Sequence, residues 1–451
     1  MIQFQFQLDG AHLNSSKWAF DNGYIEGDLQ MYVKGALFFA ETHVNVVELA
    51  IQLGKWCEAI RQAESQNFVY TSLDQEEPVF SFRLKQDGVQ LVSPSQQAEI
   101  NEHIPLKMLV GAVTRYMFAL NSYLHEIDYV EKLDRFLYDE TSENTKALML
   151  FEQNDYDAAF ALLKKLAQER RDVQSLNNLA WMYLHEEEDL AAAKGLLEEV
   201  VTQKPQAYFP YNMLGEIALA NGELQQAEAY FTTSLQLERS NEALHNLAIV
   251  YFKQARFLQA MQCFDDIKDD ADLVWLYRVF ARIKAGQIAQ AKAMLASWTP
   301  DMEDFVSATE IADVYAELGE FTLAKKWFAY DLADGSWTNY ISSRYAYVLL
   351  QLGEEARAQQ LIEAQLVWKD EEIAEAEEED CDATWTELDK EVRITELKAQ
   401  KDELSQLVEQ LKQGLVPHYD YDLYPTSGCY LFGCKQHGHG EYVELDNGES
   451  E

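Results

Sequence analysis

The first 138 residues combine strand-like and helix-like patterns of apolar residues. In residues 2–8 (IQFQFQL), apolar residues alternate with glutamines, which places them on one face of a strand. Short apolar runs predict further strands at Leu29–Val33, Ala36–Phe39, Phe68–Leu73, Val79–Leu84 and Val89–Val92. Helical spacing predicts one helix within Val46–Ile60 and another that begins at Pro105. We therefore expect an α+β domain over residues 1–138, with an antiparallel sheet and two helices.

A pattern with a period near 34 residues follows, from about residue 140 to about residue 372. Mostly small residues recur at intervals of 31 to 35 residues: Ala147, Ala180, Gly215, Ala248, Val279, Ala312 and Ala346. Twelve residues after each lies an alanine: Ala159, Ala192, Ala227, Ala260, Ala291, Ala324 and Ala358. Four residues further on lies a large apolar residue: Leu163, Leu196, Phe231, Phe264, Leu295, Phe328 and Ile362. Because all three columns keep the same intervals, we expect a tandem array of paired helices.

The last 81 residues contain an acidic run, a helix and a tail. Residues 371–382 (EEIAEAEEEDCD) are interpreted as a solvated linker or helix end, with contact to a basic partner as the alternative. Residues 385–415 predict one more helix, which is too short for an independent coiled coil and is expected to cap the array. After Pro417 the chain is rich in tyrosine and glycine. The predicted domains are residues 1–138, 139–372, 373–416 and 417–451.

The repeated segment resembles the tetratricopeptide repeat (TPR) family. The best copy reads YNMLGEIALANGELQQAEAYFTTSL, with Leu214-Gly215, Ala227 and Phe231 at the signature positions of the family. Later copies contain Leu-Gly-Glu at residues 318–320 and 352–354, where the paired helices turn. The resemblance covers about half of the chain and implies a mainly α protein. About seven helix pairs would stack into a superhelix with a concave surface.

In this family the first helix of each repeat lines the concave groove. Carried over to this chain, the lining comprises Asn177, Trp181, Asn212, Glu216, His245, Ile249, Phe252, Leu276, Phe280, Thr309 and Asp313. The family binds acidic C-terminal peptides through lysine and arginine at such positions, whereas these residues are neutral, apolar or acidic. The resemblance therefore implies a protein or peptide partner with basic or apolar anchors. Some of these side chains are expected to pack between helices instead.

The N-terminal segment is similar to a small uncharacterised bacterial domain found near toxin and immunity genes. The similarity rests on Trp18, the strand at residues 37–39 and the helix at residues 49–56. The histidines of this segment (His12, His43, His103 and His125) have no metal-ligand spacing. No functional site is predicted here.

The charge of the chain restricts its partners. The 451 residues include 77 acidic and 36 basic side chains, for a net charge of −41. Nucleic acid and anionic membranes are therefore excluded as expected partners. The chain lacks a long apolar run and a signal-like N-terminus, and its five cysteines suit a reducing compartment, so we expect a cytoplasmic location.

One group of residues in the tail consists of side-chain types that bind metal ions. Cys429, Cys434, His437 and His439 are spaced C-x4-C-x2-H-x-H, and four such ligands suit a closed, structural Zn²⁺ site. The alternative is two reduced cysteines and two solvated histidines in a flexible tail. A redox pair is disfavoured because the spacing is not C-x-x-C.

The sequence contains none of the common catalytic motifs, such as the phosphate-binding loop, H-E-x-x-H or G-x-S-x-G. We therefore expect a non-enzymatic scaffold that binds a basic or apolar partner protein through the concave groove. One alternative is an immunity or antitoxin-type protein that neutralises a basic toxin. A second alternative is a metal-dependent hydrolase or nuclease.

Overall fold

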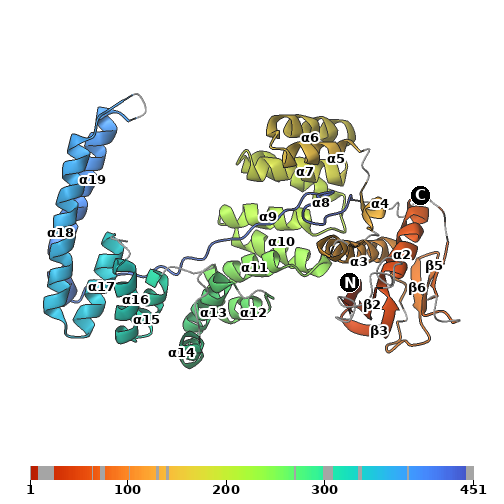
Figure 1. The fold of residues 1–451 in the computed structure, drawn as a ribbon, viewed down its shortest axis with the longest axis horizontal. Helices are drawn as coiled ribbons and strands as arrows, with labels where there is room; N and C mark the ends of the chain where they lie inside the picture. The colour runs from red at the N-terminus through yellow and green to blue at the C-terminus, as the bar shows by residue number, and fades with distance from the viewer. Residues whose placement is uncertain are drawn as a thin grey trace. The chain divides into compact units, whose positions relative to one another are not determined.

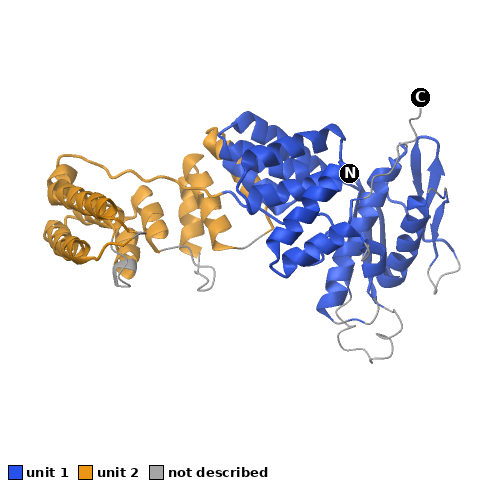
Figure 2. Ribbon diagram, turned by 90° about the horizontal axis from the view of Figure 1, so that it is seen from above, with its two compact units in different colours: residues 1–250, 425–451 blue, residues 251–424 orange. Residues whose placement is uncertain are grey.

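The computed structural model describes residues 2–8, 25–62, 64, 66–71, 77–100, 102–127, 129, 132–138, 142–268, 271–297, 308–333, 338–382 and 385–442. The chain divides into two compact units, one of residues 1–250 with 425–451 and one of residues 251–424 (Figure 2). Trp18, His12 and the end of the strand predicted at Phe68–Leu73 lie outside the described residues.

The described part of the N-terminal domain contains two three-stranded antiparallel sheets (Figure 1). The first has the order β1 (Ile2–Leu8), β2 (Glu26–Val33), β3 (Ala36–Asn45), and the second β4 (Phe68–Tyr70), β5 (Phe80–Lys85), β6 (Gly88–Val92). In β1, Ile2 and Phe4 are buried while Gln3 and Gln5 are exposed, as the alternation of residue types predicts. The strand order follows the chain, so each sheet is a simple meander.

Two helices pack against these sheets, α2 (Val46–Arg61) and α3 (Leu106–Glu126), and the short helix α4 (Asp134–Leu137) packs against both helices. Trp56 of α2 is buried beside Phe68 and Phe82 of the second sheet, with ring centroids 6.0 and 5.4 Å away. Tyr116 of α3 donates a hydrogen bond of 2.8 Å to the carbonyl of Val46. The predicted α+β character of this domain is confirmed.

The described residues next form seven consecutive helix pairs, as the repeat pattern predicts. Their helices are α5 (Glu143–Glu152), α6 (Tyr156–Arg170), α7 (Val173–His185), α8 (Leu190–Thr202), α9 (Phe209–Ala220), α10 (Leu224–Leu237), α11 (Asn241–Lys253), α12 (Phe257–Asp265), α13 (Asp272–Lys284), α14 (Ile288–Ser297), α15 (Ala308–Glu317), α16 (Phe321–Ala333), α17 (Asn339–Gln351) and α18 (Glu355–Glu378). In each pair, the turn between the two helices contains one residue with a positive φ, in the left-handed backbone region: Asn154, Glu188, Gly222, Ala255, Gly286, Gly319 and Gly353. The chain is mainly helical, and the expected fold class is confirmed.

The columns of small and large residues form the interior of the repeats, with one shift. In the second repeat, Ala193 and Leu197 are fully buried, whereas the predicted Ala192 and Leu196 are half-buried. Adjacent residues of the same type stand at both positions, so composition alone did not identify the buried pair. Asp189 caps α8 by accepting a hydrogen bond from the Ala192 backbone and so places the helix one residue later in the repeat.

Two helical glycines provide a matched test of this packing. A Cβ added to Gly215 in α9 would lie 2.6 Å from the Phe231 ring, whereas one added to Gly195 in α8 meets nothing within 4 Å. We expect Gly215→Ala to destabilise the protein by about 1–3 kcal/mol through overpacking. Gly195→Ala should stabilise it by about 0.5–1 kcal/mol, because alanine is the better helix former. Urea unfolding measures both, and a shift of the same sign in both variants contradicts this account.

The unit of residues 251–424 ends in two long antiparallel helices, α18 and α19 (Glu387–Lys412), where the sequence predicts a capping helix. Three ion pairs join them: Lys412–Glu355, Lys401–Asp370 and Lys398–Glu377. The acidic run from residue 371 continues α18 as far as Glu378, so α18 crosses the predicted domain boundary at residue 372. None of the described helices combines the length and apolar composition required to cross a bilayer.

Candidate functional site

In the first unit, residues 425–442, called here the C-terminal segment, lie along the first helices of the repeats. Two asparagines hold the backbone of this segment. Asn246 of α11 accepts a hydrogen bond from Thr426 N (2.9 Å) and donates one to Thr426 O (2.7 Å). Asn178 of α7 does the same with Phe432 N (2.8 Å) and Phe432 O (2.9 Å). Each amide thus satisfies both backbone groups of one residue, as a neighbouring β-strand would.

These asparagines break a local rule of helix composition. Asn178 and Asn246 lie inside helices and have no exposed surface, although asparagine is a poor helix former and costly to bury without partners. Their hydrogen bonds to the C-terminal segment satisfy both amide groups. Asn177, also fully buried, adds a bond of 2.7 Å to the carbonyl of Tyr430.

Aromatic side chains of the segment complete the core of the neighbouring repeats. Tyr430 and Phe432 are 1% and 5% exposed and belong to the same apolar cluster as the repeat helices. Their rings lie 5.8 and 4.8 Å from the ring of Phe209 in α9. Trp181 Nε1 donates to the carbonyl of Gly428 (3.3 Å). The segment is therefore held through both its backbone and its side chains.

Glu216 of α9 receives two hydroxyl groups of the segment. The Tyr430 hydroxyl donates to Oε1 (2.8 Å) and the Ser427 hydroxyl to Oε2 (2.7 Å), while Asn212 Nδ2 contacts the Tyr430 hydroxyl (3.4 Å). Burial raises the pKa of Glu216 to about 8; Ser427 and Tyr430 oppose the shift, and the negative charge of Glu242 adds to it. A carboxyl group with this pKa is partly protonated near neutral pH.

The end of the segment is anchored at the start of α5. The Glu441 carboxylate accepts hydrogen bonds from Ser142 (3.3 Å), Thr145 (3.1 Å), Asn144 (3.4 Å) and Gln174. Ser142 is the N-cap of α5, so the negative charge lies near the positive end of a helix dipole. Asn144 also donates to the carbonyl of Phe432 (3.0 Å).

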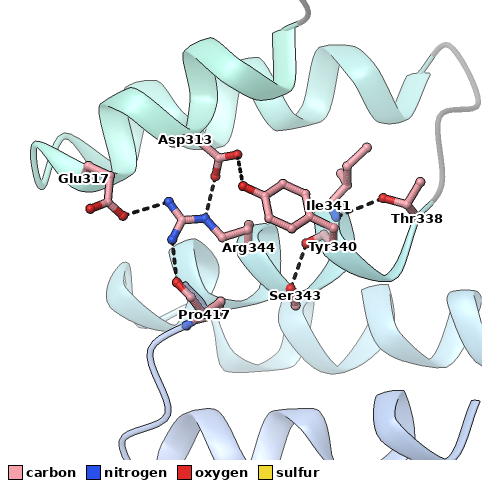
Figure 3. A network of polar contacts seen from close by, with 8 residues as sticks. All are labelled: Asp313, Glu317, Thr338, Tyr340, Ile341, Ser343, Arg344 and Pro417. Carbon is pink, nitrogen blue, oxygen red and sulfur yellow. Dashed lines mark hydrogen bonds and ion pairs between the residues drawn. The ribbon is translucent and has the colours of Figure 1, made fainter. Parts of the chain in front are cut away.

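In the second unit, Arg344 of α17 holds the start of the preceding stretch, residues 417–424. Its Nη1 donates to the carbonyl of Pro417 (2.7 Å), Nε pairs with Asp313 and Nη2 with Glu317 (3.0 Å) (Figure 3). Tyr340 donates a further bond of 2.6 Å to Asp313. The guanidinium is fully buried, and burial raises the pKa of Asp313 although Arg344 opposes the shift.

Residues 417–424 also lie against α13. The backbone N–H of Tyr424 donates to the Tyr277 hydroxyl (2.8 Å). The ring of Tyr421 lies 5.1 Å from that of Phe280, and Lys284 Nζ lies 3.8 Å from the centre of the same tyrosine ring. This stretch is thus bound by hydrogen bonds and aromatic contacts, as the C-terminal segment is in the first unit.

Most predicted groove residues meet the chain's own tail. Six contact residues 417–442: Asn177, Trp181, Asn212, Glu216, Phe252 and Phe280. Asp313 contacts Arg344 instead, and four others are buried: His245, Ile249, Leu276 and Thr309. As a surface for a separate partner, the whole set stays a prediction.

Sequence reasoning missed a second column of contacts. Asn178, Asn246, Tyr277 and Arg344 all lie two residues before a position of the first repeat column, at Ala180, Ala248, Val279 and Ala346. Each forms a hydrogen bond with the tail backbone. The signal was available, because polar groups recur there inside otherwise apolar helices.

Three of the four predicted metal ligands lie together. The ligand atoms of Cys429, Cys434 and His437 are all within 4.8 Å of one another, and Cys434 Sγ is 3.4 Å from His437 Nδ1. His439 instead packs on Phe209, with ring centroids 4.7 Å apart. A hydrogen bond between the two cysteines lowers the pKa of Cys434 and raises that of Cys429. Thiolates and imidazole at this separation fit a divalent zinc ion.

Two families match parts of the chain. Residues 210–241 match the tetratricopeptide repeat, and residues 2–126 match a domain of unknown function (DUF7878). No curated protein matches the chain. The match to an uncharacterised domain is consistent with the expectation for the N-terminal segment, while its link to toxin and immunity genes stays a prediction.

The solved structures that match parts of the chain include two tetratricopeptide repeat proteins. A tetratricopeptide repeat protein from Parabacteroides merdae is 16% identical, with 55% of this chain and 94% of that chain covered and a TM-score of 0.38. The C-terminal part of a TPR repeat-containing protein from Cytophaga hutchinsonii is 15% identical, with 49% and 93% covered and a TM-score of 0.40. The match at residues 210–241 agrees with the resemblance to the tetratricopeptide repeat predicted from the sequence, and the match at residues 2–126 is to the uncharacterised domain DUF7878.

Proposed function

We propose that this chain is a non-enzymatic scaffold for protein–protein interaction whose repeat helices bind an extended segment of a partner protein. The observation that carries the proposal is the pairing of Asn178 and Asn246 with the backbone of the C-terminal segment. An amide that pairs with the N–H and C=O of one residue binds an extended backbone whatever the side chain. The C-terminal segment is then an intramolecular ligand that a partner displaces.

The side chains around the segment indicate the chemistry of the partner. The rings of Tyr430 and Phe432 pack against Phe209 and the neighbouring helices. This packing favours a partner with aromatic anchors. The Glu216 carboxyl group accepts hydroxyl donors from the segment, and the same carboxylate can accept a basic side chain. Both features agree with the expectation of apolar or basic anchors.

The covalent tether gives the segment an advantage over external ligands. A tethered segment has an effective concentration on the order of millimolar, so a separate peptide of equal intrinsic affinity competes poorly. Weakening the tethered segment should therefore increase the apparent affinity for a separate one. This relation distinguishes an intramolecular ligand from a permanent part of the fold.

A labelled peptide of residues 425–442, added to the full chain under reducing conditions with EDTA, tests the proposal. The recipient is either the unmodified chain or a Tyr430→Ala, Phe432→Ala variant, in which the tethered segment is weakened while the repeat helices are unchanged. We expect the variant to bind the peptide at least about tenfold more tightly, as measured by fluorescence anisotropy.

Substitutions in the repeat helices show whether the peptide uses the proposed surface. Adding Asn178→Ala and Asn246→Ala to the weakened variant should abolish binding, whereas Asn221→Ala, an exposed residue after α9, should not. Binding that survives loss of both asparagines overturns the proposal. Hydrogen exchange at Phe432 N–H in the unmodified chain is an independent check, since exchange only through global unfolding would make the segment a permanent part of the fold.

A further inference from the structure

The C-terminal segment makes a compact loop between its two points of attachment to the repeats. The loop closes through the hydrogen bonds Gly433 N to Gly440 O (2.8 Å) and His439 N to Cys434 O (2.8 Å). Gly433 and Gly438 have φ values of +86° and +66°, a region that favours glycine. This turn brings together three side chains that are distributed over nine residues of sequence.

We propose that Cys429, Cys434 and His437 form a three-ligand zinc site whose fourth position is open. In a tetrahedral site, Zn–S bonds of about 2.3 Å and Zn–N bonds of about 2.0–2.1 Å place ligand atoms roughly 3.3–3.8 Å apart. The largest separation here is within 4.8 Å and that between Cys434 Sγ and His437 Nδ1 is 3.4 Å, so small side-chain movements complete the geometry. Two sulfur ligands and one imidazole select Zn²⁺ over Mg²⁺ or Ca²⁺.

The fourth position differs from the sequence-based expectation of His439. The imidazole of His439 packs on Phe209, and its ring centroid is 6.0 Å from that of His437. The three ligands instead line a cavity of about 560 Å³ that Glu152, His185 and Glu242 also line. A site with three protein ligands takes water or an incoming group as the fourth, so this cavity supplies the open position.

The position of the site couples zinc to the binding surface, a step that rests on the proposed function. Cys429 follows Gly428, whose carbonyl is bound by Trp181, and Cys434 follows the stretch that Asn178 holds. A metal that links residues 429, 434 and 437 removes conformational freedom from the released segment and so favours the bound one. Zinc should therefore slow release of the segment.

Metal analysis of the full chain, purified in the presence of zinc and a non-thiol reductant, tests the site. We expect about one equivalent of zinc per chain, and Co²⁺ substitution should give thiolate charge-transfer absorption together with tetrahedral d–d bands. Cys434→Ser and His437→Ala should lose the metal. The controls His439→Ala and Cys381→Ser should retain it, the latter because Cys381 lies in the other unit.

Circular dichroism of each variant separates loss of the metal from loss of the fold. Absence of bound zinc from the folded chain, a Cys429–Cys434 disulfide in its place, or equal loss in His439→Ala overturns the site. The coupling is tested by hydrogen exchange at Phe432 N–H, which zinc should slow at least about tenfold relative to EDTA; equal rates overturn it. Because peptide binding is measured in EDTA, failure of the zinc site leaves the test of the proposed function intact.

Discussion

Arg344→Ala should destabilise the unit of residues 251–424 by about 3–5 kcal/mol. The guanidinium has no exposed surface, and Asp313, its partner, is only 1% exposed. Removing the cation leaves a buried carboxylate that keeps the hydrogen bond from the Tyr340 hydroxyl, and it also leaves the carbonyl of Pro417 without this donor. The cost comes mainly from the buried charge of Asp313 that loses its cation, because the desolvation of this carboxylate is then no longer compensated by the ion pair.

Hydrogen exchange of amides in α17 measures this effect within the affected unit. The matched control is Arg357→Ala, because Arg357 is 61% exposed and pairs with Glu354 at the surface, so its loss should change stability by less than about 1 kcal/mol. A double variant, Arg344→Met with Asp313→Leu, should recover much of the loss by replacing both charges with apolar groups. Equal effects of Arg344→Ala and Arg357→Ala would show that the buried charge does not dominate.

The repeat array was predictable because its signals are local. Helix pairs bury small and large residues at fixed spacing, and the turn between helices requires a residue that tolerates positive φ, such as Gly319 or Gly353. The one-residue shift at Ala193 escaped prediction because alanines and leucines occur in adjacent pairs there. In that repeat the N-cap at Asp189, a structural detail, determines which face is buried.

The course of the tail could not be derived in the same way. Residues 417–442 have no strand or helix period, and their partners lie far away in sequence, as with Asn178 and Phe432, which are 254 residues apart. The positions carried over from the repeat family identified the helix face that contacts the tail. They did not indicate that the chain's own tail covers this face. The sequence also contained the metal ligands but not their geometry, because the backbone turn at Gly433 and Gly438 directs His439 away from the cluster.

Binding of a C-terminal segment that carries Cys434→Ser should weaken as the pH rises from about 6.5 to about 8. The pKa of Glu216 is raised by burial from 4.5 to about 8, so the bound state holds a proton that the released state loses. Its contribution is complete below about 4.5 and declines as the pH approaches 8. His185, near Ser427, acts in the opposite direction: burial lowers its pKa from 6.5 to about 4, so its contribution is lost as the pH falls from 6.5 toward 4. Above pH 6.5 the opposing group is Cys434, whose pKa is lowered in the bound segment from 9.0 to about 6, so a segment with Cys434→Ser isolates the effect of Glu216.

The affinity of a labelled peptide of residues 425–442 with Cys434→Ser for the Tyr430→Ala, Phe432→Ala variant, measured between pH 6.5 and 8.5, tests this linkage. Because one proton is released with the segment, the dissociation constant should rise by at most about tenfold per pH unit, and it should level off above pH 8. Glu216→Gln keeps a neutral acceptor for the peptide hydroxyls and should flatten the profile. Glu223→Gln, in the same repeat but paired with Lys194, should leave the slope unchanged. An equal slope in Glu216→Gln would contradict the assignment of the titration to Glu216.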